Sequence, residues 1–199
     1  MITKNITFRC HSGGAIGADV HFEYFGALYG VKTLAYSYQT PYHKSINKVE
    51  ISQADFQDGI QKIALANQSL KRKVNVKHLN LLARNWQQIK NADQVFAVSK
   101  IIFKNTECVS GGTGWAVQMA IDHHKEIFVF DQVQNAWFEW SYSDSKFCIL
   151  ESCPTITSLN FAGIGIRKIT LKEAFPGMSW LTVDMNGELD LGDVDWKII

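Results

Sequence analysis

Long apolar runs, an excess of charge of one sign and clustered cysteines are all missing from this 199-residue sequence. Twenty Lys and Arg residues stand against nineteen Asp and Glu residues, so the formal charge of +1 offers no global field for a polyanion or an anionic membrane. No apolar stretch reaches the roughly 18–20 residues of a membrane-spanning helix, and residues 1–10 lack the apolar core of a secretory signal. We therefore expect a cytoplasmic protein without a membrane partner.

Metal-binding patterns are also missing. The cysteines form no C-x-x-C pair and no Cys/His spacing typical of zinc, and the adjacent His123 and His124 would point in different directions on a helix. We expect no metal site and reduced, mostly buried thiols, with one pair close enough to join in an oxidising setting. The four cysteines are Cys10, Cys108, Cys148 and Cys153, and the possible pair is the last two.

What the sequence does contain is an alternation of short apolar runs, glycine turns and stretches of helical period. This alternation is typical of β-α-β units and predicts a Rossmann-like α/β fold: a doubly wound, mainly parallel sheet with helices on both faces. The chain is long enough for one such domain with a real core. We assign residues 1–175 to this domain and residues 176–199 to a small β-rich C-terminal extension.

Individual elements follow from the same pattern. For example, Leu79, Leu82, Ala83 and Trp86 lie at i, i+3, i+4 and i+7, which predicts one apolar helix face. The predicted strands are 6–10, 31–36, 95–98, 107–109, 127–130 and a hairpin over 137–150; the predicted helices are 17–28, one capped by Ser52, 79–91 and 115–123; residues 37–51 are predicted as a loop, and 160–162 lead into a glycine turn at Gly163 to Gly165.

Two glycine turns carry the functional argument. Ser12-Gly13-Gly14-Ala15 and Ser110-Gly111-Gly112-Thr113 each follow a predicted strand and precede a predicted helix. Such turns let backbone N–H groups converge on an anion at a helix N-terminus, with no Cβ in the way. Neither turn matches G-x-G-x-x-G or the Walker lysine motif, so an ordinary dinucleotide fold or a P-loop ATPase is not indicated. We expect the two turns to be two walls of one ligand site.

The same residues carry a family resemblance. Ser12 to Asp19 resembles the first glycine turn of the SLOG superfamily, a Rossmann-like group that includes LOG phosphoribohydrolases, DNA-processing protein A and ligand sensors of antiphage systems. Gly111 to Gln118 is similar to its second signature, G-G-x-G-T-x-x-E, and Phe161 to Arg167 resembles a segment of bacterial and phage members. Over residues 7–167 the resemblance implies a site for a nucleotide or a ribosyl phosphate across both turns.

The sequence departs from the second SLOG signature at one position that matters for function. In the phosphoribohydrolases the glutamate that closes the second signature acts on the ribose during cleavage of the N-glycosidic bond, and Gln118 stands at that position here. An amide has no titratable proton and cannot act as a general base. We therefore expect a protein that senses or sequesters a nucleotide, such as an ADP-ribose or cyclic-nucleotide signal, with no catalytic residue and no cofactor. An N-glycoside hydrolase remains the first alternative.

A DNA-binding module is the second alternative, suggested by the basic residues of segment 71–77, although the balanced overall charge favours a solvated face. By analogy with relatives we also expect a homodimer or larger assembly. Candidate roles within the site are phosphate binding for Arg84 and Arg167, ribose contacts for Asp19 and Asp131, and base stacking for Trp115. The predicted ligand-binding residues are Ser12, Gly13, Gly14, Ala15, Gly17, Asp19, Arg84, Gly111, Gly112, Thr113, Gly114, Trp115, Gln118, Asp131, Gly163, Gly165 and Arg167.

Overall fold

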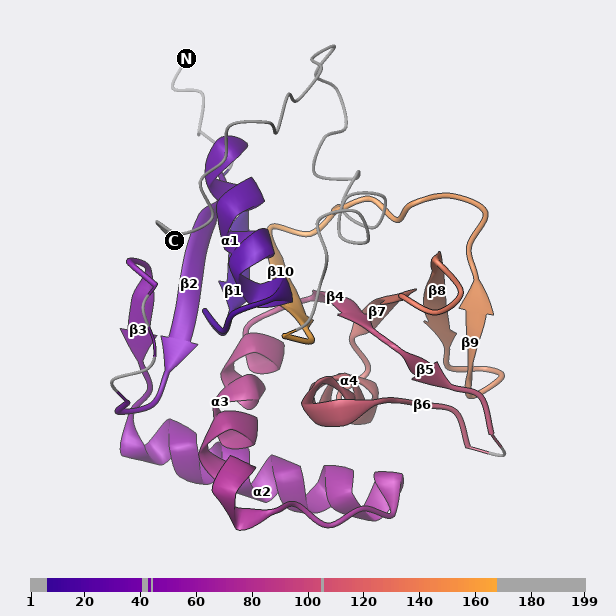
Figure 1. The fold of residues 1–199 in the computed structure, drawn as a ribbon, viewed down its shortest axis with the longest axis horizontal. Helices are drawn as coiled ribbons and strands as arrows, with labels where there is room; N and C mark the ends of the chain where they lie inside the picture. Colours follow the sequence, from indigo (N-terminus) through magenta and orange to yellow (C-terminus); the bar gives the residue numbers. More distant parts are fainter. Residues whose placement is uncertain (1–6, 41–42, 44, 105, 168–199) are drawn as a thin grey trace.

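The computed structural model describes residues 7–40, 43, 45–104 and 106–167. An eight-stranded sheet forms the centre of this part of the chain (Figure 1). Its strands are β1 (Arg9–Ser12), β2 (Lys32–Ser37), β3 (Lys48–Glu50), β4 (Gln94–Ser99), β7 (Glu126–Asp131), β8 (Ala136–Ser141), β9 (Lys146–Ile149) and β10 (Asn160–Gly165). They lie in the order β3-β2-β1-β10-β4-β7-β8-β9. All neighbours from β3 to β7 are parallel, and β8 and β9 continue the sheet in antiparallel pairing.

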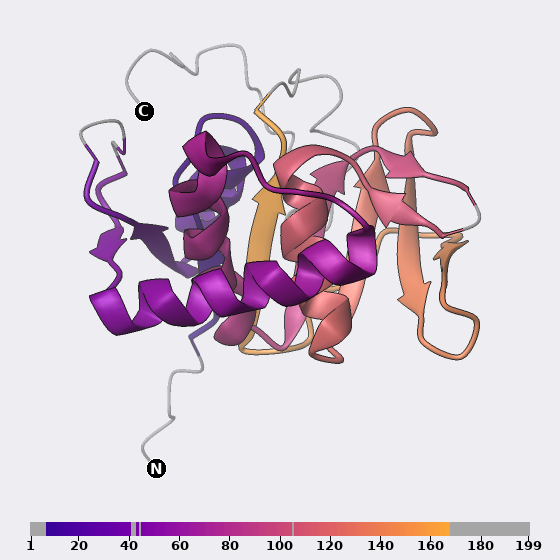
Figure 2. The same cartoon turned by 90° about the horizontal axis from the view of Figure 1, so that it is seen from below.

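Helices cover both faces of the sheet, as the doubly wound prediction requires. The helices of the described residues are α1 (Ala18–Leu28), α2 (Gln53–Leu70), the short 3-10 helix η1 (Val76–His78), α3 (Leu79–Lys90) and α4 (Gly111–Asp122). Helix α1 packs on β1, β2 and β10, whereas α3 and α4 pack on the opposite face. Figure 2 shows α2 running across the outside of α3 and α4, which it contacts.

The side chains of β4 show why the sheet needs both layers. Phe96 and Val98 belong to the core cluster with Phe22 of α1, whereas Val95 and Ala97 belong to the cluster beneath α3 and α4. Successive residues of a strand point to opposite faces, so a strand that is apolar at every position must be covered twice. The Rossmann-like α/β prediction is therefore confirmed.

Local sequence signals explain several element boundaries. Ser52 caps α2 by accepting a hydrogen bond from the backbone N–H of Asp55 at 3.1 Å, as predicted. The predicted hairpin over 137–150 is confirmed as β8 and β9. The predicted strand 107–109 is confirmed only as the short β6 (Cys108–Val109), which pairs with β5 (Ile101–Ile102) outside the main sheet. The N–H of Ser110 donates to the carbonyl of Lys100 at 2.9 Å, so the β5–β6 hairpin returns the chain to the end of β4.

The prediction of a third glycine turn at Gly163 to Gly165 is wrong. Gly163 and Gly165 lie inside β10, which inserts between β1 and β4 at the middle of the sheet. Both glycines serve close packing: a Cβ at Gly163 would overlap the ring of Phe22, and one at Gly165 would overlap the Cβ of Ala18. Removing these side chains lets α1 approach the central strand.

Two smaller expectations also need correction. The predicted loop over 37–51 contains the edge strand β3, which pairs with the end of β2. Cys10 is the one buried cysteine, since Cys108 and Cys148 are half-buried and Cys153 is exposed, and all four are free thiols. The predicted domain boundary at residue 175 and the extension 176–199 lie outside the described residues. None of the helices in the described part of the chain combines the length and apolar character that a membrane crossing requires.

Candidate functional site

Both glycine turns lie at the same edge of the sheet. Strands β1 and β4 are parallel members of one sheet, so the segments that follow them emerge at the common carboxyl edge, on either side of the end of β10. From β1 the chain crosses through α1 to β2 in one direction, and from β4 it crosses through α4 to β7 in the other. Ligands of open α/β sheets bind in the crevice at such a reversal of strand order.

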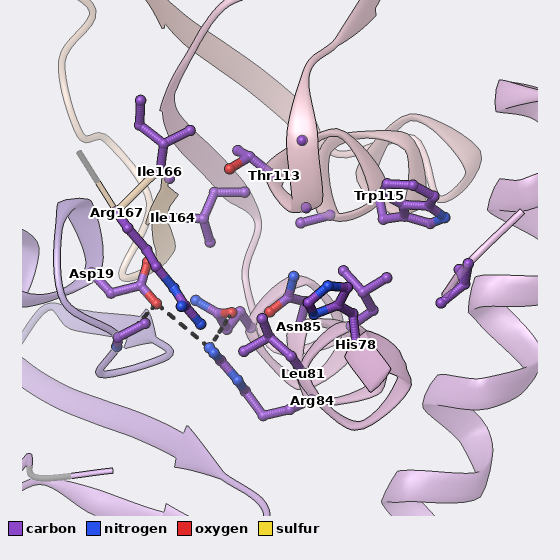
Figure 3. Close-up of a pocket in the computed structure, with 18 of the residues that line it drawn as sticks. Asp19, His78, Leu81, Arg84, Asn85, Thr113, Trp115, Ile164, Ile166 and Arg167 are labelled. Carbon is purple, nitrogen blue, oxygen red and sulfur yellow. Dashed lines mark hydrogen bonds and ion pairs between the residues drawn. The ribbon is translucent and has the colours of Figure 1, made fainter. Parts of the chain in front are cut away.

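A cavity of about 470 Å³ occupies this crevice (Figure 3). It is bounded by Ala15 and Asp19 from the first turn and helix α1, by Gly111, Gly112 and Thr113 from the start of α4, and by one side of α3. Figure 3 shows Asp19, Arg84 and Arg167 at one end of the cavity and Trp115 at the opposite end. We call this space the first compartment.

The second glycine turn is the first turn of α4 itself, rather than a loop that precedes the helix. Helix α4 begins at Gly111, and the side chain of Ser110 makes no capping hydrogen bond. Gly111 adopts a left-handed φ of 61° with open space where a Cβ would lie. The first N–H groups of a helix have no intrahelical acceptor, and the helix dipole places positive potential there. The first compartment therefore borders an uncapped helix N-terminus.

The first glycine turn is arranged differently. The N–H of Ala15 donates to Oδ2 of Asp19 at 3.4 Å, the N–H of Gly14 donates to Oγ of Ser12 at 3.5 Å, and the N–H of Ala18 donates to the carbonyl of Ile166 at 3.1 Å. The guanidinium of Arg84 fills the space where a Cβ of residue 13 would lie. Several amides of this turn are thus already bonded within the protein, and a cation packs against its backbone.

Arg84 belongs to a buried polar chain. Its Nη1 lies 3.5 Å from Oδ2 of Asp19 and donates to Oε1 of Gln88 at 2.9 Å, while Nε2 of Gln88 donates to the carbonyl of Gly163 at 3.5 Å. The side chains of Arg84 and Asp19 are 4% and 7% exposed. These contacts fix the guanidinium in one orientation at the edge of the first compartment.

Burial and neighbouring charges act on this pair in opposite directions. Burial raises the pKa of Asp19 above its ordinary value, although the guanidinium of Arg84 opposes the shift. Burial lowers the pKa of Arg84, and its partner Asp19 opposes that change. The positive charge of Arg167 lowers the pKa of Arg84 further. Arg167 is exposed, so one fixed and one solvent-accessible guanidinium lie at the same end of the first compartment, and Asp19 pairs with the fixed one.

The charge of the first compartment follows from its lining. Lys73, Arg84 and Arg167 are cations, and Asp19 is the one carboxylate among the described residues that line it. The cations therefore outnumber the carboxylate by two, and the N-terminus of α4 adds partial positive charge. No three His, Cys, Asp or Glu side chains in the described ranges gather closely enough to hold a metal ion. The first compartment is suited to an anion.

The structure brings about half of the predicted residues to this compartment. Gly13 and Gly14 border a neighbouring cavity on the other side of the first turn. The predicted residues that line the first compartment are Ala15, Asp19, Arg84, Gly111, Gly112, Thr113, Trp115, Gly165 and Arg167. Those that line neither cavity are Ser12, Gly17, Gly114, Gln118, Asp131 and Gly163.

The side chains outside the cavities have structural partners. Asp131 accepts hydrogen bonds from the N–H groups of Ile101, Val133 and Gln134 at 2.7–3.1 Å, so it organises the end of β7. Gln118 donates through Nε2 to Oδ1 of Asp122 at 2.8 Å. Their predicted ligand contacts have no geometric support in these two cavities.

Trp115 lies in the first compartment in a fixed position. Its indole N–H donates to Oδ1 of Asn67 at 2.8 Å, and the guanidinium of Arg72 lies 5.6 Å from the ring centre. The ring is thus already stacked on a cation, and its remaining surface lines the compartment.

The residues of the basic segment 71–77 have different environments. Arg72 donates to the carbonyl of Val109 at 3.2 Å, whereas Lys73 lines the first compartment.

Sequence reasoning missed several lining residues on one side of the cavity. Gln88 and Leu81 lie one turn on either side of Arg84 on the inner face of α3, and His78 ends η1 just before that helix. Their spacing from Arg84 was available as a signal, since residues three and four apart share a helix face. The direction in which that face points depends on packing against β1 and β10, which no local pattern encodes.

The fold and the cleft define a Rossmann-like α/β protein with a cationic crevice at the carboxyl edge of its sheet. Comparisons with protein-family models, curated proteins and solved structures find no significant match to this chain. The resemblance to the SLOG superfamily therefore stays a prediction.

Proposed function

We propose that this protein binds a phosphate-bearing nucleotide, or a signal derived from NAD or a cyclic nucleotide, and senses or sequesters it without cleavage. The observation that carries the proposal is the lining of the first compartment, where three cations, Lys73, Arg84 and Arg167, outnumber the carboxylate of Asp19 and the N-terminus of α4 forms part of the wall. A phosphate in this space would meet helix amides and guanidinium groups together, the combination that phosphate sites use most.

The fixed position of Arg84 favours binding further. Gln88 and Asp19 hold its guanidinium before any ligand enters, so little side-chain entropy is lost on binding. The repulsion between Arg84 and Arg167 falls when an anion is bound between them.

Hydrolysis of an N-glycosidic bond has weaker support. Asp19 is the one carboxylate of the first compartment within the described residues, and it is engaged by Arg84 and by the N–H of Ala15. Gln118, at the position of the glutamate in the resembling signature, bonds to Asp122 outside the cavity. Binding without cleavage fits these contacts better than general acid–base chemistry does.

Titration calorimetry tests the proposal with inorganic pyrophosphate, adenosine monophosphate, ADP, ADP-ribose and NAD. We expect pyrophosphate and at least one nucleotide to bind, and Arg167→Ala to weaken that binding roughly ten- to hundred-fold, since a charge-assisted hydrogen bond is lost. Lys146→Ala is the matched control, because Lys146 is an exposed cation on β9 that lines neither cavity. Absence of heat with every compound would refute the proposal.

Chromatography of the same mixtures distinguishes a binder from a hydrolase. Free adenine or nicotinamide that accumulates with the native chain, and no longer accumulates with Asp19→Asn, would establish the hydrolase alternative instead. The expected homodimer and the cytoplasmic location also stay predictions, and size-exclusion chromatography with light scattering tests the first of them.

A further inference from the structure

A second cavity adjoins the first compartment and is larger. It has a volume of about 670 Å³ and shares Ala15, Leu81, Arg84 and Arg167 with the first compartment. Residues that line both spaces mark the place where the two meet, so the two arginines stand at their common boundary. We call the larger cavity the second compartment.

Helix α1 forms one long wall of the second compartment. Val20, Glu23, Tyr24 and Ala27 line it at i, i+3, i+4 and i+7, so they share one helix face. Seven residues of α-helix extend over about 10 Å, the length scale of a nucleoside. The remaining lining includes Ser37 and Tyr38 at the end of β2 and the later residues His43, Ser45, Ile46 and Asn47. The second compartment therefore has a wall about as long as a nucleoside, next to the two arginines that it shares with the first compartment.

Glu23 gives the second compartment a specific polar group. The residue is 8% exposed, and its Oε1 accepts hydrogen bonds from Oγ of Ser45 at 2.5 Å and Nδ2 of Asn47 at 2.6 Å. Its Oε2 has no hydrogen-bond partner among the described residues. A carboxylate accepts hydrogen bonds and does not donate them, so the free oxygen is suited to a hydroxyl or N–H donor.

His43 lies beside the first glycine turn and lines the second compartment. Its ring packs on Gly14, and the protein encloses both ring nitrogens. Burial and the nearby charge of Arg84 lower the pKa of His43, which favours the neutral ring with one donor and one acceptor. His43 therefore shapes the wall of the second compartment, and the carboxylate of Glu23 supplies its polar group.

We infer that the two compartments form one bipartite site, whose ligand is a phosphate-bridged molecule with two arms, one of which presents hydroxyl or N–H donors to Glu23. The bridging phosphate lies at Arg84 and Arg167, where the compartments meet. The inference rests on the proposed function and extends it from any phosphate-bearing nucleotide to the dinucleotide class. A ligand with one arm would leave one compartment empty.

Two blocking variants test the arrangement. Ala27→Trp fills the second compartment from an exposed position near the end of α1, and His78→Trp fills the first from an exposed position in η1. Calorimetry uses inorganic pyrophosphate, ADP with one nucleoside arm, and ADP-ribose and NAD with two arms. We expect NAD or ADP-ribose to bind the native chain at least about ten-fold more tightly than ADP, a difference that a second buried arm readily supplies.

The affinities of the variants for one-armed and two-armed ligands test whether the two compartments form one site. Each blocking variant should weaken the tighter two-armed ligand about ten-fold or more, whereas ADP should be weakened by one of the two only. Pyrophosphate binding should stay unchanged in Ala27→Trp, which lies outside the first compartment, and this result also shows that the anion site is folded in that variant. Urea denaturation checks that His78→Trp is folded, because its indole enters the compartment that holds the anion. Glu23→Gln replaces the free acceptor and should weaken the two-armed ligand while pyrophosphate binding is kept.

Two different failures are distinguishable. If pyrophosphate and ADP bind, but neither two-armed compound binds more tightly than ADP or responds to both blocking variants, the bipartite site is refuted and the proposed function stands. If no phosphate compound binds the native chain, the proposed function itself is refuted, and the bipartite site with it.

Discussion

The two Ser-Gly-Gly turns are nearly identical in sequence and differ in what surrounds them. Both follow a strand at the carboxyl edge of the sheet, and both precede a helix. At the first turn, Arg84 and His43 pack on the glycine backbone and several amides are bonded internally. At the second, the uncapped start of α4 borders an open cavity. The same three residues thus give a closed turn in one place and an open one in the other.

The difference teaches that glycine serves two separate purposes in such turns. Gly13 is required because a guanidinium occupies the position of its missing Cβ, so the first turn contributes by seating Arg84. Gly111 is required by its left-handed φ of 61°, and nothing lies within 4 Å of where its Cβ would be. We expect the first turn to act on an anion through a cation, and the second to act through its own amides.

The largest expected effect comes from removing that cation. Arg84→Met keeps much of the side-chain volume but leaves Asp19 buried without its partner, so we expect a loss of about 3–5 kcal/mol in the free energy of unfolding at neutral pH. Pyrophosphate binding should also fall. Urea denaturation measures the first effect, and Lys90→Met is the control on the same helix, since its exposed pairs with Asp55 and Asp58 are worth about 1 kcal/mol or less.

The pH dependence of this variant gives a sharper test. Burial already raises the pKa of Asp19, and loss of the guanidinium raises it further. A carboxyl whose pKa is higher in the folded chain than in the unfolded chain costs no stability below its unfolded pKa, and the cost grows as the pH rises from that value to the folded pKa. The deficit of Arg84→Met relative to the native chain should therefore shrink as the pH falls. A deficit that is constant with pH would contradict the ion pair.

The second-largest expected effect is the loss of stability in Gly13→Ala, which tests whether the first turn is packed against Arg84. In Gly13→Ala the new Cβ would overlap the guanidinium of Arg84 and a carboxylate oxygen of Asp19, so the buried pair must move apart. We expect a loss of about 1–3 kcal/mol, typical of a disturbed buried network, with weaker pyrophosphate binding. Gly112→Ala is the matched control, because neither Gly13 nor Gly112 has a left-handed φ and the new Cβ at residue 112 would make only an ordinary contact at 3.5 Å. If Gly13→Ala binds pyrophosphate as tightly as the native chain does, Arg84 does not contribute to the anion site.

The sequence predicted the alternation of strands and helices because burial on two faces leaves continuous apolar strands, such as β4, and period 3.6 in helices such as α3. The position of β10 was not predictable in this way. It pairs with β1 across about 150 residues of chain, and its pattern of Phe161, Ala162 and Gly163 resembles a strand leading into a turn. Long-range pairing leaves no local signal of which strands become neighbours.

Some residues of the candidate site were predictable from the sequence and others were not. Arg84 and Arg167 were predicted as phosphate ligands, and both line the boundary of the two compartments. Arg84 was predicted from its place beside an apolar helix face, whereas Arg167 was predicted from a glycine turn that the structure replaces by the end of β10. Gln118 and Asp131 were predicted from the signature and from a strand end, and both line neither cavity. Their direction depends on how α4 and β7 sit on the sheet. Glu23 and His43 gave no signal, because their place in the second compartment depends on how α1 and the residues after β2 pack in the folded chain.

The smallest expected effect is the gain of stability in Gly112→Ala, which tests whether the second turn is open. In Gly112→Ala the new Cβ would lie 3.5 Å from Cδ2 of Leu82, an ordinary contact, and the residue is in the first turn of α4. Replacing a helical glycine by alanine removes backbone entropy from the unfolded chain, so we expect a gain of about 0.4–1 kcal/mol by urea denaturation. The N–H is kept, so pyrophosphate binding should change less than about two-fold, well under the ten-fold that 1.4 kcal/mol represents. The opposite signs for Gly13→Ala and Gly112→Ala distinguish a covered turn from an open one. If Gly112→Ala instead loses stability as Gly13→Ala does, the second turn is packed closed, and the amides of α4 are not available to a ligand.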